Sequence, residues 1–186
     1  LAWQLFANSL SNSSGSLLAG ANLISKVYFA RLVVPLSSLL VALIDFGIVL
    51  GVYVLAAFWT GTIPGASALL LPFFILTVLL LALGAGLWLA ALTVRFRDFR
   101  IVVPFLLQIG VFATPVGYRT DNIPNWYELL ALNPMTGAID AFRWSLLQVD
   151  SFPTNSFLIT LTWTAALLAG GIWYFRRVEK TLVDII

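Results

Sequence analysis

The stretch that decides the fold is LVVPLSSLLVALIDFGIVLGVYVLAAFW, residues 32–59. It is almost continuously apolar, and Asp45 is its single charged residue. A helix needs roughly 20 such residues to cross the hydrocarbon core of a bilayer. The stretch therefore predicts a transmembrane helix about Leu32–Trp59, which ends at the turn residues TGTIPG.

The composition extends this interpretation to the whole chain. Hydrophobic residues make up 61% of it and charged residues 10%, with a mean hydropathy of +1.00. Soluble domains carry about 25% charged residues, and transmembrane barrels show alternating segments of about 10 residues instead of long apolar runs. We therefore expect an all-α, polytopic helical membrane protein.

Further apolar runs predict further spans. Three are clear, and a fourth, Leu1–Leu18, is uncharged but rich in Ser and Asn, so hydropathy alone leaves it undecided. The three clear runs are about 66–94, 101–118 and 157–175.

The basic residues favour a crossing by Leu1–Leu18. Eight of the ten fall in three clusters, at 26–31, 95–100 and 176–180, and these follow alternate spans if Leu1–Leu18 also crosses. Short basic loops stay in the cytoplasm. We therefore expect five spans, a cytoplasmic C-terminus, and outer loops near 60–66 and 118–155. Because an odd count starts the chain outside, we also expect an upstream span before Leu1.

Between the first two predicted spans lies AGANLISKVYFAR, residues 19–31, which is too short and polar to cross. Two interpretations stay open: a solvated turn on the membrane surface, or a helix that docks a cytoplasmic partner. The residues of interest are Asn22, Leu23, Ile24, Lys26, Val27, Tyr28 and Arg31.

Asp45 lies near the middle of its span, where a carboxylate costs a few kcal/mol on insertion scales. It could face a substrate or ion path, or it could be a hydrogen-bonded packing residue. We slightly favour the packing role, since no basic residue is expected at that depth. Gly47 and Gly51 form a GxxxG pattern, which is a weak signal for close helix packing.

The outer loop near 118–155 contains two short helical patterns. The second starts with Asn133 as N-cap and Pro134 at the first helical position, a favoured pairing. It is too short to cross, and Asp140 and Arg143 can pair at i, i+3. The first pattern, about 125–132, carries Trp126, Tyr127 and Glu128. Together the two predict a short re-entrant helical hairpin, or alternatively a peripheral outer cap.

Several kinds of chemistry lack their residues. The chain has no Cys and no His, which excludes the commonest metal sites and His-based acid–base catalysis. It has no G-x-x-x-x-G-K-[ST] loop, so it does not itself bind ATP through that motif. We expect no catalytic residue, cofactor or metal in this chain.

Four motifs together closely resemble the permease subunits of ABC-2 type transporters, and more narrowly the exporters of O-antigen, capsule or teichoic-acid chains. They are ANLISKVYFARLVVPLSSLL, RFRDFR, NPMTGAIDAFRWSLL and the ending YFRRVEKTLVDII.

The resemblance implies a single transmembrane domain over residues 1–186, matching spans two to six of a six-span permease. It implies a homodimer in the bacterial inner membrane, joined to P-loop ATPase subunits that bind ATP and Mg. The cargo would be a lipid-linked glycan, with no role for nucleic acid. Residues 19–31 would meet the ATPase, and the hairpin would be the re-entrant helices.

Three rival functions stay open. One is an ABC-2 permease for a drug or a lipid. Another is an ion-coupled carrier, although that would want paired intramembrane charges. The last is a membrane-embedded glycan-processing enzyme that uses outer carboxylates, with Asp121, Glu128, Asp140 or Asp150 as candidates.

Overall fold

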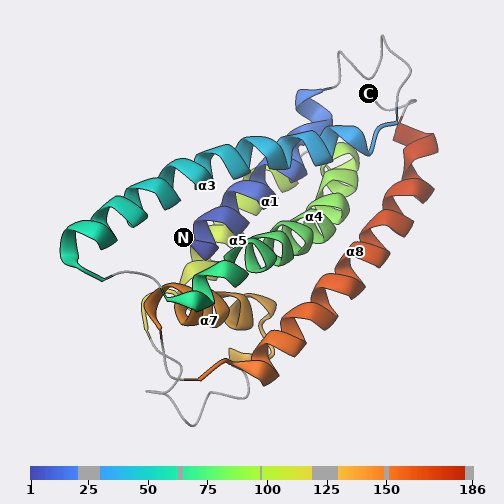
Figure 1. Cartoon of the computed structure of the whole chain (residues 1–186). Coiled ribbons are helices and arrows are strands. Elements are labelled where there is room, and N and C mark those ends of the chain that lie inside the picture. Colours follow the sequence, from blue (N-terminus) through green and yellow to red (C-terminus); the bar gives the residue numbers. More distant parts are fainter. Residues whose placement is uncertain (21–29, 63–64, 97, 119–129, 149–150, 183–186) are drawn as a thin grey trace.

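The protein is a bundle of helices, as a computed structural model of the chain shows (Figure 1). The structure describes residues 1–20, 30–62, 65–96, 98–118, 130–148 and 151–182, and no strand occurs among them. The predicted all-α class is therefore confirmed. In chain order the helices are α1 (Ala2–Ala19), α3 (Val33–Thr60), the 3-10 helix η1 (Ala66–Leu70), α4 (Leu71–Arg95), α5 (Phe99–Ala113), α7 (Pro134–Leu147) and α8 (Thr154–Leu182).

Helix α4 is the centre of the bundle. It packs against α1 on one side and against α8 on another, and α1 in turn packs against α3. Helix α4 buries many of its residues, most of them between Phe74 and Val94, whereas α3 buries few of its own. The long apolar α3 therefore presents most of its surface outward.

Close approaches between helices depend on small residues. A Cβ placed on Gly84 of α4 would lie 2.7 Å from the backbone nitrogen of Leu168 in α8, and one on Gly86 would meet Ser13 of α1. Small residues let membrane helices approach until their backbones touch. Helix α4 thus uses glycines to contact both of its main neighbours.

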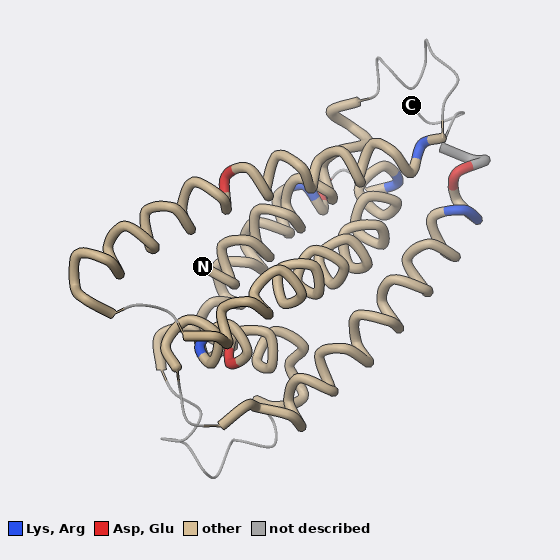
Figure 2. The backbone as a smooth tube through the Cα atoms, in the orientation of Figure 1, with Lys and Arg blue, Asp and Glu red and all other residues tan. Residues whose placement is uncertain are grey.

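The two ends of the bundle differ in charge. Arg95 ends α4, Arg100 lies in the first turn of α5, and an Arg31 guanidinium nitrogen donates to the Glu179 carbonyl oxygen near the end of α8. Figure 2 shows most of the Lys and Arg that it colours at this end, which we call the basic end. The opposite end, which we call the α7 end, holds α7 and the beginnings of α1 and α8 (Figure 1).

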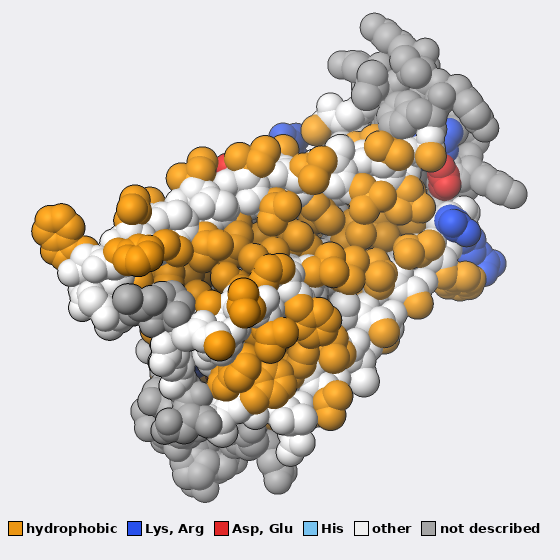
Figure 3. Space-filling model, viewed as in Figure 1, with side chains coloured by type: hydrophobic (Ala, Val, Ile, Leu, Met, Phe, Trp, Pro, Cys, Tyr) orange, Lys and Arg blue, Asp and Glu red, His pale blue; other side chains and the backbone are white. Residues whose placement is uncertain are grey.

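The surface between these ends is that of a membrane protein. Figure 3 shows hydrophobic side chains covering much of this face, with charged ones mainly near the basic end. Within the described residues, three helices are long and apolar enough to cross a bilayer: Val33–Thr60, Ala66–Arg95 and Thr154–Glu179. These correspond to three of the predicted spans.

The other two predicted spans differ from expectation in detail. Helix α5 ends at Ala113, five residues before the expected Tyr118, because Thr114 precedes Pro115 and takes an extended conformation. A residue before proline is disfavoured in the α region. Helix α1 confirms the helix expected over Leu1–Leu18 and packs inside the bundle, but its Ser and Asn keep its hydropathy below that of the other three. Their crossing of the membrane stays a prediction.

Candidate functional site

Helix α7 forms as the sequence predicts. Asn133 is its N-cap, and its side-chain oxygen accepts a hydrogen bond from the Met135 backbone nitrogen at 3.0 Å. Pro134 occupies the first helical turn, where its missing N–H costs nothing. With 14 residues the helix is about 21 Å long, too short to cross a bilayer of about 30 Å.

The buried face of α7 seats it on the α7 end of the bundle. Met135, Ala138 and Phe142 lie in the core together with Phe74 and Phe157. The carbonyl oxygen of Pro134 accepts a hydrogen bond from the Thr160 hydroxyl of α8 at 2.7 Å. The Leu146 and Ser145 carbonyl oxygens accept from Tyr53 of α3 and Ser67 of η1. Helix α7 therefore joins three elements that lie apart in the sequence.

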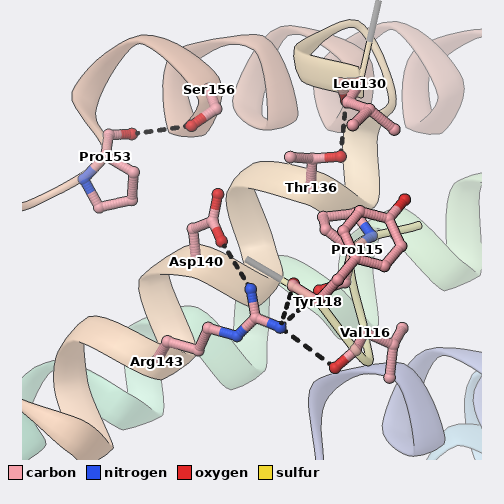
Figure 4. A network of polar contacts seen from close by, with 9 residues as sticks. All are labelled: Pro115, Val116, Tyr118, Leu130, Thr136, Asp140, Arg143, Pro153 and Ser156. Atoms are coloured by element: carbon pink, nitrogen blue, oxygen red, sulfur yellow. Dashed lines mark hydrogen bonds and ion pairs between the residues drawn. The ribbon is translucent and has the colours of Figure 1, made fainter. Parts of the chain in front are cut away.

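Arg143 joins α7 to the chain that follows α5 (Figure 4). One guanidinium nitrogen lies 3.2 Å from an Asp140 carboxylate oxygen. The other donates to the carbonyl oxygens of Pro115 at 2.6 Å, Val116 at 3.1 Å and Tyr118 at 3.0 Å. The pairing expected between Asp140 and Arg143 is thus present, and Arg143 satisfies carbonyls beyond the helix end, which lack helical partners.

Asn133 contributes to the same joint. Its amide nitrogen donates to the Ala113 carbonyl oxygen at 3.3 Å and to the Thr114 hydroxyl at 3.1 Å. The joint defined by Asn133, Asp140, Arg143 and residues 113–118 therefore fixes α7 against the end of α5. Arg143 makes four contacts, which position α7 against the chain that follows α5. The arrangement does not resemble a catalytic acid–base pair.

Part of the predicted site lies outside the described residues. This applies to Trp126, Tyr127 and Glu128 of the first hairpin arm, and to Asn22, Leu23, Ile24, Lys26, Val27 and Tyr28 of the segment 19–31. Of that segment, Arg31 is described, and it contacts α8 at the basic end.

Asp45 lies on an exposed position of α3. It makes no hydrogen bond or ion pair with any residue that the structure describes, so the packing role that we slightly favoured has no contact to support it. It lines a small hollow with Gln4, Asn8 and Phe46, on the seam where α3 meets α1. A Cβ on Gly47 or Gly51 would have nothing within 4 Å, so the GxxxG pattern makes no contact within the described chain.

Sequence reasoning missed the polar residues that face this seam. Two more hollows line it, one toward each end, with Arg100 and Ser37 at one and Tyr53 and Arg143 at the other. The signal was available, because Gln4, Asn8, Ser11 and Asn12 repeat at helical spacing along α1. The partner helix α3 could not be assigned without the structure.

No group of three or more metal-ligating side chains occurs in the described part of the chain. The site is thus a helix bundle with a basic end, an α7 end and a polar seam between α1 and α3.

The amino-acid sequence is similar to those of known proteins. Residues 5–147 match the ABC-2 type transporter family. An O-antigen export system permease protein RfbA of Klebsiella pneumoniae is 26% identical over 187 residues, which cover 99% of this chain and 71% of the relative. A protein of the same name from Myxococcus xanthus is 29% identical over 185 residues, covering 96% of this chain and 71% of the relative. The chain therefore belongs to the ABC-2 type transporter family, as a multi-pass inner-membrane transport subunit.

Proposed function

We propose that this protein is the permease subunit of an ABC exporter that moves a lipid-linked polysaccharide of the O-antigen type outward. The observation that carries the proposal is the match to O-antigen export permeases over nearly the whole chain. The seam of polar side chains in an otherwise apolar bundle supports a hydroxyl-rich cargo. The chain has no Walker motif, so hydrolysis of Mg-bound ATP is assigned to a separate P-loop ATPase.

The basic end supports an orientation. Short loops rich in Lys and Arg stay on the cytoplasmic side, and Arg31, Arg95, Arg100, Arg176 and Arg177 all belong to helix ends or turns at this end. We therefore place this end, with the C-terminus, in the cytoplasm. The α7 end then faces the outer side, where the polysaccharide leaves.

The segment 19–31 is the proposed ATPase contact. It connects the end of α1 to the start of α3, so a push on it reaches both helices. Arg31, at its end, donates to the Glu179 carbonyl oxygen of α8. A displacement of the segment would thus be passed to three helices. Two permease copies with two ATPases would place the cargo path between them.

The rival functions have less support. Asp140 is held by Arg143 at the joint and is therefore a weak candidate for a catalytic acid, and Asp121, Glu128 and Asp150 lie outside the described residues. No observation favours a drug, a lipid or an ion as cargo.

Two measurements test the proposal. The tagged protein, purified from native membranes, should bring with it a P-loop ATPase in equal amount. Removal of the gene should leave a lipid-linked polysaccharide accumulated in the cytoplasm. A purified permease that transports without any ATPase would overturn the first point, and unchanged surface polysaccharide in the deletion strain would overturn the second.

A charge reversal tests the proposed contact. We expect Lys26→Glu to lower export while ATP hydrolysis by the partner continues, because the change alters the segment that would receive the push. Arg177→Glu at the same end is the control, since Arg177 is exposed and its guanidinium stacks on Trp173 of its own helix. Normal export by Lys26→Glu would argue against docking.

A further inference from the structure

The seam between α1 and α3 carries three hollows that follow one another from the basic end to the α7 end. The first, of about 660 Å³, is lined by Ser11, Asn12, Ser37, Ser38 and Arg100, among others. The second, of about 50 Å³, is lined by Gln4, Asn8 and Asp45. The third, of about 280 Å³, lies beneath α7. Leu1 lines both the second and the third, so the series is continuous there.

Polar side chains of α1 face this seam along most of its length. Gln4, Asn8 and Ser11 are spaced by four and three residues, which places them on one side of the helix. The side of α1 that packs on α4 carries Leu5, Leu10 and Leu17 instead, all buried. That buried side also holds the small hydroxyls of Ser9 and Ser13, whereas the amide side chains of Gln4 and Asn8 lie on the seam.

The facing side of α3 adds hydroxyls and a carboxylate. Ser37 and Ser38 line the first hollow, although both hydroxyls also donate to carbonyl oxygens one turn earlier in the helix. Asp45 lines the second, with Gln4 and Asn8 opposite. The Gln4 amide nitrogen donates to the Asn8 amide oxygen at 3.3 Å. A carboxylate at mid-span marks a water-filled or polar path by default.

We propose that this seam is one wall of the cargo path, and that Asp45, Gln4 and Asn8 bind the sugar hydroxyls at its narrowest point. The inference rests on the proposed function and adds the surface along which the cargo moves. Amide and carboxylate groups supply donors and acceptors together, and a hydroxyl is both a donor and an acceptor. The acyl chain of a lipid could pair with neither the donors nor the acceptors.

The volumes support contact along the wall. The first hollow is within the range of small-molecule sites, roughly 300–1,000 Å³. The second has room for about one or two water molecules at ~30 Å³ each. A sugar ring therefore passes this point along the open side of the seam, where Asp45 is exposed, and is not enclosed by α1 and α3.

Because the chain has no cysteine, single cysteines can report access to water. Ser11→Cys and Ser38→Cys place a thiol on either wall of the first hollow. Leu40→Cys is the matched control, because Leu40 is 62% exposed but lies two residues past Ser38 and so on the other side of α3. The probe is a charged methanethiosulfonate reagent, added to open membranes that contain the full transporter.

We expect both seam cysteines to react at least ten-fold faster than Leu40→Cys. The reaction should slow when the membranes come from cells that make the strain's own O-antigen chain, compared with cells that make none. Seam cysteines that react as slowly as Leu40→Cys would mean that lipid or another helix covers the seam, and would overturn the proposal. An equal reaction rate in the presence and absence of the O-antigen chain would also overturn the proposal.

Asp45 is tested by export. Loss of a hydrogen bond to a charged group lowers an equilibrium by roughly ten-fold or more. We expect Asp45→Leu to lower export of the polysaccharide by about that factor, Asp45→Asn to lower it less, and Leu40→Ala to leave it unchanged. The gene deletion distinguishes a failure of the proposed function from a failure of the proposed cargo path. Intact export in the deletion strain refutes the proposed function. Export that needs the gene but ignores Asp45→Leu refutes only the role of the seam.

Discussion

Arg143 shows how one side chain can replace regular helical bonding at the end of a membrane helix. The carbonyl oxygens of Pro115, Val116 and Tyr118 lie beyond α5, where helical N–H partners have run out. Buried carbonyls without partners are costly in an apolar setting. A guanidinium with five donors in a fixed plane can serve several of them together. This explains the cation on α7 without invoking cargo.

Removal of Arg143 should therefore destabilise the protein. Arg143→Ala leaves three carbonyls and Asp140 without this partner, which corresponds to about 2–4 kcal/mol. Arg143→Lys should retain only part of this stability, because an ammonium keeps the positive charge but cannot reach all of these partners as the planar guanidinium does. Thermal unfolding of the purified protein in detergent measures the difference. The control is Arg177→Ala, an exposed arginine at the basic end, and a loss of stability equal to that of Arg143→Ala would contradict the assigned role.

At the scale of helices, the contact of α4 with α8 depends on glycine. A Cβ on Gly84 would lie 2.7 Å and 2.8 Å from backbone atoms of Leu168 and Leu167, and one on Gly171 would lie 2.6 Å from the Gly84 carbonyl oxygen. Backbone atoms cannot turn aside as a side-chain tip can. The two helices would have to separate along their length to admit one methyl group.

Gly84→Ala should accordingly lower the free energy of unfolding by about 1–3 kcal/mol, the usual cost of overpacking. The matched control is Gly51→Ala on α3, where a Cβ meets nothing within 4 Å. There the change should be neutral or stabilising by up to about 1 kcal/mol, since alanine favours helix. The two variants thus have opposite expected signs in the same unfolding assay. A stabilising Gly84→Ala would show that α4 and α8 are not in backbone contact.

The sequence predicted some elements well because their signals are local. Asn133 and Pro134 mark the start of α7 by capping and fixed backbone geometry, and the structure confirms both. The end of α5 was misplaced because apolarity continues past Ala113 while Pro115 acts on the backbone. Asp45 could not be assigned at all, since its surroundings depend on α1, which lies about 40 residues away in the chain.

At the scale of the whole molecule, the placement of charge was the strongest signal. The three basic clusters come from separate parts of the sequence, and the described arginines of all three lie at one end of the bundle. The family was also predictable, because its motifs extend over most of the chain, and the match over residues 5–147 confirms the resemblance. What the sequence could not provide was the seam, which exists only once α1 and α3 lie side by side.

The orientation of the bundle gives the last prediction. Since basic loops stay in the cytoplasm, the basic end and the α7 end must lie on opposite sides of the membrane. Thr62→Cys, in the turn that follows α3, should react with an impermeant maleimide added to intact spheroplasts. Arg177→Cys, on the last turns of α8, should react only after the membrane is opened. The natural chain, which has no cysteine, gives the background. The reverse pattern would place the C-terminus outside, and the segment 19–31 could then not meet a cytoplasmic ATPase.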